Sequence, residues 1–155
     1  MLPSALGETA GAQPPAWAGS YVGIPFAELG RDRAGCDCWG LVRLVLGERA
    51  GLALPLWSTR EPDAEAAIEG QRDSGDWLRI APGSEQPMDV VEMSGVVRVE
   101  GDRFAWGSLH VGLVVGCGWL LHSERVSGAV LARYRQDPVK RRVLGLWRHR
   151  ARCPS

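Results

Sequence analysis

A strongly apolar segment of helical length follows a loop that ends in Gly35-Cys36-Asp37. The segment contains no proline, and its apolar side chains would cover more than one face of a helix, which is typical of a helix buried in a core. Its apolar residues are Trp39, Leu41, Val42, Leu44, Val45 and Leu46, and its charged residues are Arg43, Glu48 and Arg49. Gly47 and Gly51 indicate where the helix ends. The pattern therefore predicts a buried helix that begins at Cys38.

From residue 77 onward the chain changes to short runs rich in β-formers, separated by turn signals. The turn signals are Pro82-Gly83, Gly101-Asp102, Gly116-Cys117-Gly118 and Ser127-Gly128. The predicted strands cover residues 88–93, 96–99, 103–106, 109–115, 119–122, 130–134 and 143–147. The first half predicts a helical turn over 17–21, a structured loop over 22–37, an extended segment over 52–60 and a surface helix over 62–72. Helices followed by an antiparallel meander indicate an α+β fold.

The length and composition of the chain fit one domain, and its net charge does not indicate a nucleic-acid or membrane partner. The 155 residues are 45% hydrophobic, which is enough for a core. We expect a single domain over residues 14–155, preceded by a flexible arm, rich in alanine and glycine, over residues 1–13. Lys plus Arg equals Asp plus Glu at 18 each, so the net charge is zero. We therefore expect neither a nucleic-acid nor a membrane partner.

The cysteines and the N-terminal residues suggest where the protein is made. The four cysteines lack the pattern of a disulfide framework, and Cys36 and Cys38 are too close for ordinary disulfide geometry. Residues 1–15 lack the pattern of a signal peptide, and no run is long enough to cross a membrane. We therefore expect reduced thiols in a protein made in the cytoplasm. A substrate outside the cytoplasm would require delivery by a route other than secretion.

A cysteine at the start of a buried helix is a candidate nucleophile. The unpaired N–H groups and the positive end of the helix dipole stabilise an anion, so they are expected to lower the pKa of the Cys38 thiol. Papain-like enzymes present their nucleophile in this way. A thiol nucleophile also needs a base, which must come from elsewhere in the chain.

The chain contains three histidines, and His110 lies in a predicted strand. Strand alternation places His110, Gly112 and Val114 on one face and Leu109, Val111, Leu113 and Val115 on the other. The second face is core. The glycine beside His110 leaves room for a substrate or another backbone segment to approach. His149 is interpreted as a surface residue.

His122 follows His110 across a predicted hairpin. If residues 116–118 form a three-residue loop, Val115 opposes Trp119, Gly112 opposes His122 and His110 opposes Glu124. The two histidines then share a face as diagonal neighbours. A two-residue turn would instead place them on opposite faces, because a slip of one residue turns every side chain over.

These residues predict a nucleophile, a base and an orienting group. Cys38 would attack a carbonyl, His110 would act as general base, and His122 would hold the imidazole of His110 in the right tautomer. The backbone N–H of Cys38 would bind the oxyanion. A zinc site formed by Cys36, Cys38, His110 and His122 has suitable ligand types. Its Cys-x-Cys spacing is unlike the usual knuckle, however, so we expect no metal and no cofactor.

These motifs resemble the NlpC-type cysteine peptidases of bacterial cell walls, in particular the short form found in phage tail gene clusters. The resemblance runs over roughly residues 17 to 149. It rests on the motifs Tyr21-Val22-Gly23-Ile24-Pro25-Phe26, Gly35-Cys36-Asp37-Cys38-Trp39-Gly40-Leu41-Val42, Asp89-Val90-Val91, His110-Val111-Gly112-Leu113-Val114-Val115 and Leu121-His122-Ser123.

The resemblance implies a papain-like α+β fold, with N-terminal helices and the nucleophile helix packed on an antiparallel sheet. It implies that Cys38, His110 and His122 are catalytic and that the substrate is a peptidoglycan stem peptide, typically cut between D-glutamate and diaminopimelate. The residues that it places near the substrate are Tyr21, Phe26, Asp37 and Trp39. Similar proteins sit at the tail tips of siphophages and gene transfer agents, where they open the host wall for DNA entry. This implies tail-tip or baseplate hub partners, assembly into a virion-like particle and action in the host periplasm.

Three positions depart from the pattern of the family. Phe26 stands where many relatives have a tyrosine near the substrate. Met88 replaces the glycine usual before Asp89, and residues 94–108 form a longer predicted hairpin than the short form needs, which would suit assembly. Asp37 and Asp89 are interpreted as capping residues rather than catalytic acids.

Two alternatives to a peptidase stay open. The lack of a separate wall-binding domain and the long hairpin also fit a catalytically silent structural component of the tail tip. An amidase or acyltransferase would use the same site, because water, an amine or an alcohol can resolve a thioester.

Overall fold

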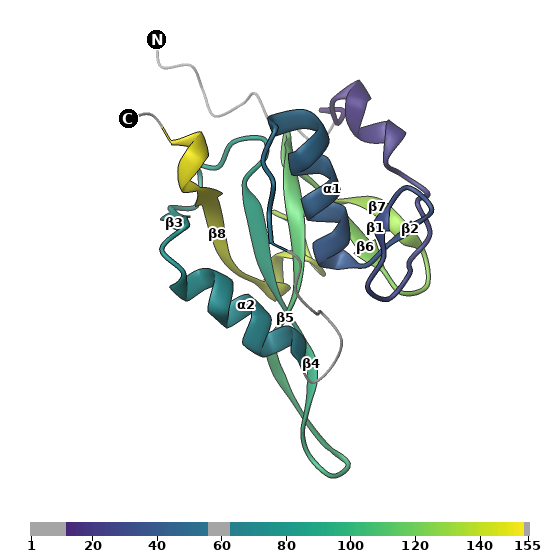
Figure 1. The fold of residues 1–155 in the computed structure, drawn as a ribbon, viewed down its shortest axis with the longest axis vertical. Helices are drawn as coiled ribbons and strands as arrows, with labels where there is room; N and C mark the ends of the chain where they lie inside the picture. The colour runs from purple at the N-terminus through teal and green to yellow at the C-terminus, as the bar shows by residue number, and fades with distance from the viewer. Residues whose placement is uncertain (1–11, 56–62, 154–155) are drawn as a thin grey trace.

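The computed structural model describes residues 12–55 and 63–153 (Figure 1). Helices α1 (Cys38–Ala50) and α2 (Asp63–Asp73) pack on one face of a curled six-stranded antiparallel sheet. This arrangement confirms the predicted α+β class. The short elements are η2 (Ala16–Ser20), β1 (Arg31–Asp32), β2 (Gly35–Cys36), η3 (Lys140–Arg142) and η4 (Arg150–Arg152). The predicted arm falls mostly outside the described residues, as does the second half of the predicted segment 52–60.

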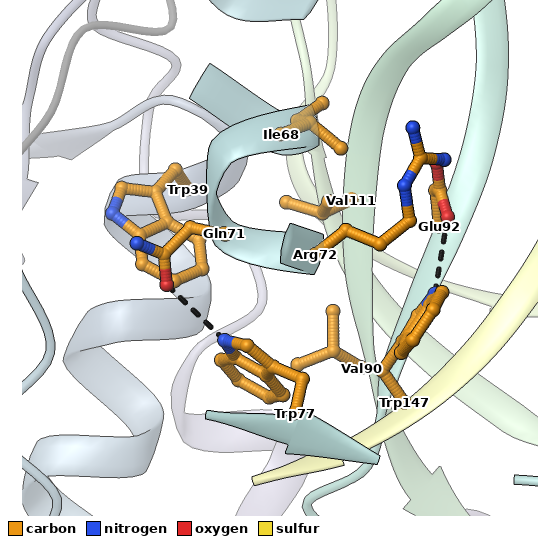
Figure 2. Close-up of a pocket in the computed structure, with 9 residues that line it drawn as sticks. All are labelled: Trp39, Ile68, Gln71, Arg72, Trp77, Val90, Glu92, Val111 and Trp147. Carbon is orange, nitrogen blue, oxygen red and sulfur yellow. Dashed lines mark hydrogen bonds and ion pairs between the residues drawn. The ribbon is translucent and has the colours of Figure 1, made fainter. Parts of the chain in front are cut away.

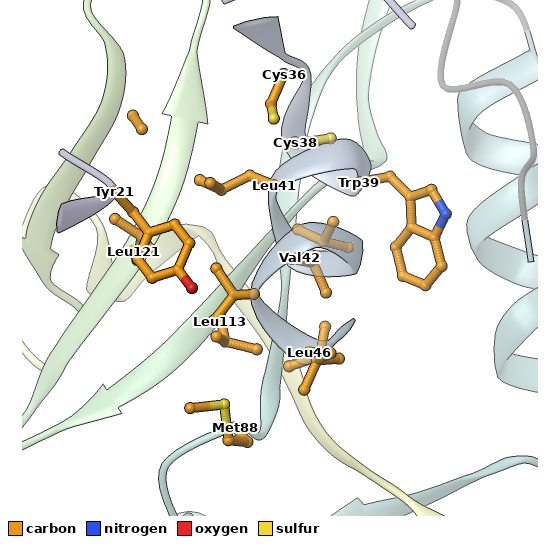
Figure 3. Packing of buried hydrophobic residues seen from close by; sticks show 14 of the residues in the cluster. Tyr21, Cys36, Cys38, Trp39, Leu41, Val42, Leu46, Met88, Leu113 and Leu121 are labelled. Carbon is orange, nitrogen blue, oxygen red and sulfur yellow. The ribbon is translucent and has the colours of Figure 1, made fainter. Parts of the chain in front are cut away.

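Helix α1 begins at Cys38, as predicted, and both of its ends are capped. The carboxylate of Asp37 accepts the N–H of Gly40 at 2.8 Å, which is the usual N-cap interaction. Gly51 ends the helix with φ +67° and donates its N–H to the carbonyl of Leu46. The buried residues of α1 form the centre of the main core, where they meet the sheet (Figure 3). They are Cys38, Trp39, Gly40, Leu41, Val42, Val45 and Leu46.

The sheet has the strand order β3-β8-β4-β5-β6-β7. Its strands are β3 (Trp77–Ile80), β4 (Val90–Glu100), β5 (Arg103–Gly116), β6 (Trp119–Glu124), β7 (Gly128–Arg133) and β8 (Val143–His149). Strands β4 to β7 form the predicted meander, but β8 returns to lie between β3 and β4, so the sheet as a whole is not a simple meander. Strand β3 was not among the predicted strands.

The turn between β5 and β6 is shorter than predicted, but the two histidines still share a face as predicted. Cys117 and Gly118 form a two-residue turn, both at positive φ, and Gly116 rather than Val115 opposes Trp119. A bulge between Val114 and Gly116 compensates for the shorter turn. Leu113 therefore opposes Leu121 as the predicted register requires, and the two histidines share a face.

Two of the three departures from the family pattern, at Met88 and at residues 94–108, correspond to visible features of the sheet. Met88 adopts φ +80°, a conformation that favours glycine, which accounts for the glycine usual at this position in the resembling family. Residues 94–108, predicted as a hairpin of short strands, are the continuous ends of β4 and β5. They protrude beyond the rest of the sheet at the bottom of Figure 1.

The sheet is covered on both faces. The face opposite α1 has a smaller apolar cluster made up of Val91, Met93, Val114, Leu120, Tyr134 and Leu146. Residues 23–25 run beside the edge strand β7, where Gly23 donates to the carbonyl of Ala129 and Ala129 donates to that of Ile24, each at 2.9 Å. No helix within residues 12–55 and 63–153 is long and apolar enough to cross a membrane.

Candidate active site

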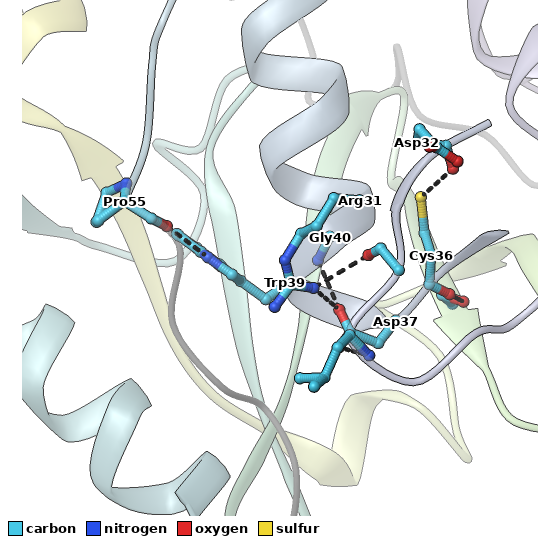
Figure 4. Close-up of polar contacts among 10 residues, drawn as sticks. Arg31, Asp32, Cys36, Asp37, Trp39, Gly40 and Pro55 are labelled. Carbon is cyan, nitrogen blue, oxygen red and sulfur yellow. Dashed lines mark hydrogen bonds and ion pairs between the residues drawn. The ribbon is translucent and has the colours of Figure 1, made fainter. Parts of the chain in front are cut away.

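The start of α1 is held in place by the loop that precedes it (Figure 4). Besides capping Gly40, the buried carboxylate of Asp37 accepts the N–H of Leu29 at 2.9 Å and pairs with Arg31 at 2.6 Å. A Cβ on Gly40 would stand 1.9 Å from the carbonyl oxygen of Gly30. The position therefore requires glycine, and Asp37 is fully engaged in holding Cys38 at the helix start, as its capping interpretation predicted.

His110 and His122 form a hydrogen-bonded pair of buried imidazoles. Nε2 of His110 lies 2.9 Å from Nδ1 of His122, and the side chains come from the neighbouring strands β5 and β6. Gly112 makes room for the pair, since a Cβ there would stand 3.2 Å from Cβ of His122. The hydrogen bond uses Nε2 of His110, so Nδ1 is the nitrogen of that ring left to exchange a proton with a nucleophile.

A carboxylate and a guanidinium lie beside the imidazole pair. Oε1 of Glu124 is 3.2 Å from Nδ1 of His122 and 3.8 Å from Nε2 of His110. Nη1 of Arg142 is 3.2 Å from the same oxygen, and Nε of Arg142 donates to the carbonyl of Ser94 at 3.2 Å. The histidines thus belong to a chain of four polar side chains that ends on the backbone of β4.

Two contacts connect the helix start with the histidine strands. The buried hydroxyl of Ser123, next to His122, donates to the carbonyl of Cys36 at 2.9 Å. The backbone N–H of Val111, next to His110, interacts with the thiol of Cys38 and favours its thiolate. The structure therefore brings the three predicted catalytic residues to one place, where α1 begins over strands β5 and β6.

Burial leaves the thiol and both imidazoles neutral at rest. Desolvation raises the pKa of Cys38 to about 11, against the N–H of Val111, and the charge of Asp37 raises it further. The N–H groups of Cys38 and Trp39 at the helix start lower this pKa, as expected, but loss of water outweighs them, so the net pKa is raised. Desolvation, His122 and Arg142 depress the pKa of His110 well below its usual range. Desolvation also lowers the pKa of His122, although Glu124 opposes it.

The arrangement suits proton sharing better than metal binding. His110, His122 and Glu124 offer ligand atoms that lie within 4.8 Å of one another. A zinc ion bound by both imidazoles would hold their nitrogens roughly 3.3 Å apart, whereas the observed 2.9 Å is a hydrogen-bond distance. The guanidinium of Arg142 lies 3.2 Å from Oε1 of Glu124, where its positive charge would oppose a cation.

Of the remaining predicted site residues, Tyr21 and Trp39 are core residues, and the hydroxyl of Tyr21 reaches the last turn of α1 rather than its start. Tyr21 is buried, and its hydroxyl donates to Glu48 at 2.7 Å; burial and this hydrogen bond raise its pKa to about 12. Phe26 is half-buried beside the backbone of Cys36, with the guanidinium of Arg125 5.1 Å from the centre of its ring.

Trp39 is buried, and its indole N–H donates to the carbonyl of Pro55 at 3.1 Å (Figure 4). Its side chain lines a small, largely apolar cavity of about 40 Å³ between α2 and the sheet (Figure 2). The lining residues are Trp39, Ile68, Gln71, Arg72, Trp77, Val90, Glu92, Val111 and Trp147. The cavity has room for a few water molecules.

Three residues of the site were not among the predicted functional residues. Glu124 was placed opposite His110 by the register argument but given no role, and an alternating strand pattern would have put it on the histidine face. Ser123 carries no sequence signal for its contact with Cys36. Arg142 lies in a 3₁₀ turn 18 residues after Glu124, so local periodicity cannot find it.

Comparisons with known proteins identify relatives of this chain. The model of the NlpC/P60 family matches residues 23–148. A gamma-DL-glutamyl hydrolase of Bacillus subtilis (strain 168) is 26% identical over 129 residues, which are 83% of this chain and 27% of the relative. The chain therefore spans about a quarter of the length of the curated relative that it matches.

Two solved structures illustrate the shared fold. An NlpC/P60 family protein from Bacillus cereus ATCC 10987 superposes with a TM-score of 0.61 at 18% identity, over 88% of this chain and 41% of that one. The NlpC/P60 domain of the peptidoglycan hydrolase SagA gives a TM-score of 0.52 at 17% identity, over 83% and 90% of the two chains.

Proposed function

This chain belongs to the NlpC/P60 family, and from that premise we propose that it is a cysteine peptidase that cleaves peptidoglycan stem peptides. The observation that carries the proposal is the buried imidazole pair near the start of α1, in which the hydrogen bond between the rings uses Nε2 of His110 and leaves its Nδ1 unused. A structural protein gains nothing from two desolvated imidazoles, because burying them costs stability whenever the surroundings are acidic.

The proposed reaction proceeds through a thioester. The thiol of Cys38 gives its proton to Nδ1 of His110, and the thiolate attacks the scissile carbonyl carbon. The N–H of Cys38 stabilises the oxyanion. The intermediate collapses with loss of the amine, which takes the proton from His110. Water, deprotonated by His110, then hydrolyses the thioester and returns the thiol. His122 accepts the Nε2–H of His110 throughout and keeps the ring in the reactive tautomer.

We propose the bond between D-glutamate and diaminopimelate as the site of cleavage. The name of the Bacillus subtilis relative, a gamma-DL-glutamyl hydrolase, supports attack on a gamma-glutamyl carbonyl. The residues proposed to contact the substrate are Tyr21, Phe26 and Asp37, which precede α1, and Trp39 in its first turn. Of these, Phe26 has exposed side-chain surface available for contact, whereas the other three are buried.

The test uses sacculi that contain diaminopimelate, incubated with the wild type and with Cys38→Ala, and mass spectrometry of the released fragments. We expect fragments that end at D-glutamate from the wild type and a loss of at least about a thousandfold in Cys38→Ala. Cys36→Ala is the matched control, because it removes a buried thiol two residues away and should keep activity.

Activity that survives in Cys38→Ala would contradict the proposal. Folded wild type that releases no fragments, even when bound in an assembled particle, would favour a silent structural component. Products joined to an added amine instead of water would favour an acyltransferase.

We also propose that the protein is made in the cytoplasm, assembled at a tail tip through hub proteins and active in the host periplasm. The resemblance to the short form of tail gene clusters supports this location. Proteomic analysis of purified particles tests it: the chain should copurify with tail proteins, and its absence from intact particles would contradict the proposal.

A further inference from the structure

The oxygen of Glu124 lies beside the proton that the two imidazoles share. Its distances to the two facing nitrogens are 3.2 and 3.8 Å, so its charge acts on the imidazole pair as a unit. Arg142 approaches the same oxygen to 3.2 Å and is itself anchored on the carbonyl of Ser94. A negative and a positive charge are thus held at fixed positions next to a buried base.

We propose that Glu124 and Arg142 are positioning residues that set, with opposite signs, how readily the imidazole pair accepts the proton of the Cys38 thiol. This inference rests on the proposed function, in which that proton transfer creates the nucleophile. The negative charge of Glu124 stabilises the state in which the pair carries an extra proton, and the positive charge of Arg142 destabilises it. Arg142 also orients the carboxylate, since their contact fixes Oε1 toward the histidines.

Among the residues that the structure describes, few charged groups lie around the pair, which makes the inference testable. The charged groups that act on the pair there are Glu124 on β6 and Arg142 on η3. The thiol of Cys38, at the start of α1, interacts with the backbone of Val111, next to His110. On the flanking strands, Met93 of β4 pairs with His110 and Val130 of β7 pairs with His122, and both are uncharged. Glu124 and Arg142 are therefore the fixed charges whose removal should move the titration of the pair.

The experiment is an NMR titration of the histidine ring signals in the full chain without substrate. Three histidines give three sets of signals, and His149 is the reference because it lies on β8, paired with Trp77 at the far side of the sheet. We expect Glu124→Gln to lower the titration midpoint of the pair by about 0.5 to 1 pH unit and Arg142→Gln to raise it by a similar amount. The double variant should titrate close to the wild type.

A merely structural role predicts a different outcome. Both single variants would then disturb the pair in the same direction, and the double variant would be worse than either. A midpoint in Glu124→Gln at or above that of the wild type would overturn the inference. The inference would also be overturned by a midpoint in Arg142→Gln at or below that of the wild type. It would be overturned as well if the histidine pair of Arg142→Gln did not titrate before that variant unfolds. Arg142→Lys keeps the charge and should leave the midpoint within a few tenths of a unit, which guards against a fold defect in Arg142→Gln.

The rate of peptide hydrolysis provides a second readout that separates this inference from the proposed function. The acidic limb of kcat/KM on sacculus fragments should move in the same order as the NMR midpoints, since both report protonation of the base. Shifts of opposite sign by NMR in a protein whose Cys38→Ala variant keeps its activity would reject the peptidase and retain the charge-setting pair. An active peptidase in which neither variant moves the midpoint would retain the proposed function and reject the role of Glu124 and Arg142.

Discussion

Two imidazoles kept neutral by burial make stability depend on pH. Below the ordinary histidine pKa of about 6.5, the unfolded chain takes up protons that the folded His110 and His122 do not bind. Protonation of the unfolded chain therefore costs the fold almost nothing above that value and destabilises it progressively as pH falls below it. The two histidines of the candidate site thus make the fold sensitive to acid.

We expect the free energy of unfolding to fall by on the order of 1 to 2 kcal/mol between pH 7 and 5.5, measured by urea denaturation. A His110→Gln/His122→Gln variant should show a shallower dependence, because it removes the two proton-binding groups. The pH range from 5.5 to 7 lies above the pKa of most carboxyl groups, so their titration adds little to the change. An equal slope in the wild type and the variant would contradict the assignment of the acid sensitivity to the pair.

At the scale of the element, α1 begins where it does because of two residues with different roles. Asp37 ends the loop with a side chain that caps the helix, and Gly40 lets the carbonyl of Gly30 approach the first turn. Gly47 lies in the same helix, but a Cβ there would meet only the carbonyl oxygen of Leu52 at 3.7 Å, an ordinary contact. The two glycines therefore offer a matched comparison.

Gly40→Ala should destabilise the protein by about 2 kcal/mol or more, because a methyl group 1.9 Å from a carbonyl oxygen forces the loop away from the helix. Gly47→Ala should instead stabilise it by about 0.5 to 1 kcal/mol through helix propensity. Thermal and urea unfolding of both variants measure the difference. Equal effects of the same sign would show that the close approach of Gly30 does not constrain the helix start.

Element identity could be predicted from the sequence where the pattern is local. The apolar run from Trp39 to Leu46 indicated the buried helix, and alternation around His110 indicated its strand. The register across the β5–β6 turn was harder, since the strand pattern cannot show that a bulge at Val115 offsets a turn one residue shorter than expected. The predicted strands 88–93 and 96–99 lie mostly in the single strand β4, and 103–106 and 109–115 are parts of β5. The pairing of β4 with β5 is irregular between Met93 and Ser94, and a strand with a bulge looks like two short strands in the sequence.

At the scale of the whole molecule, the site depends on docking of the N-terminal segment and α1 onto the sheet. The hydroxyl of Ser123 ties β6 to the carbonyl of Cys36, and the backbone of residues 23–25 follows β7. These contacts join parts of the chain about a hundred residues apart. They could not be predicted from one sequence, and neither could the contact between Arg142 and Glu124, because nothing local to either partner indicates the other.

Ser123→Ala should lower kcat about tenfold, because loss of the hydrogen bond lets the segment carrying Cys38 shift relative to the imidazoles. Its effect on the free energy of unfolding should be about 1 to 2 kcal/mol. Ser127→Ala, in the exposed turn after β6, is the control and should change neither quantity. A Ser123→Ala enzyme with unchanged kcat would mean that other contacts set the position of the nucleophile.

The buried, protonated state of Cys38 also governs how the protein ages. Peroxides and disulfides react with thiolates, and burial raises the pKa of the Cys38 thiol to about 11, so little of it is ionised at neutral pH. Cys117, by contrast, is exposed at the tip of the β5–β6 turn. Air oxidation should therefore begin with covalent dimers through Cys117, while the nucleophile survives long storage without a reducing agent.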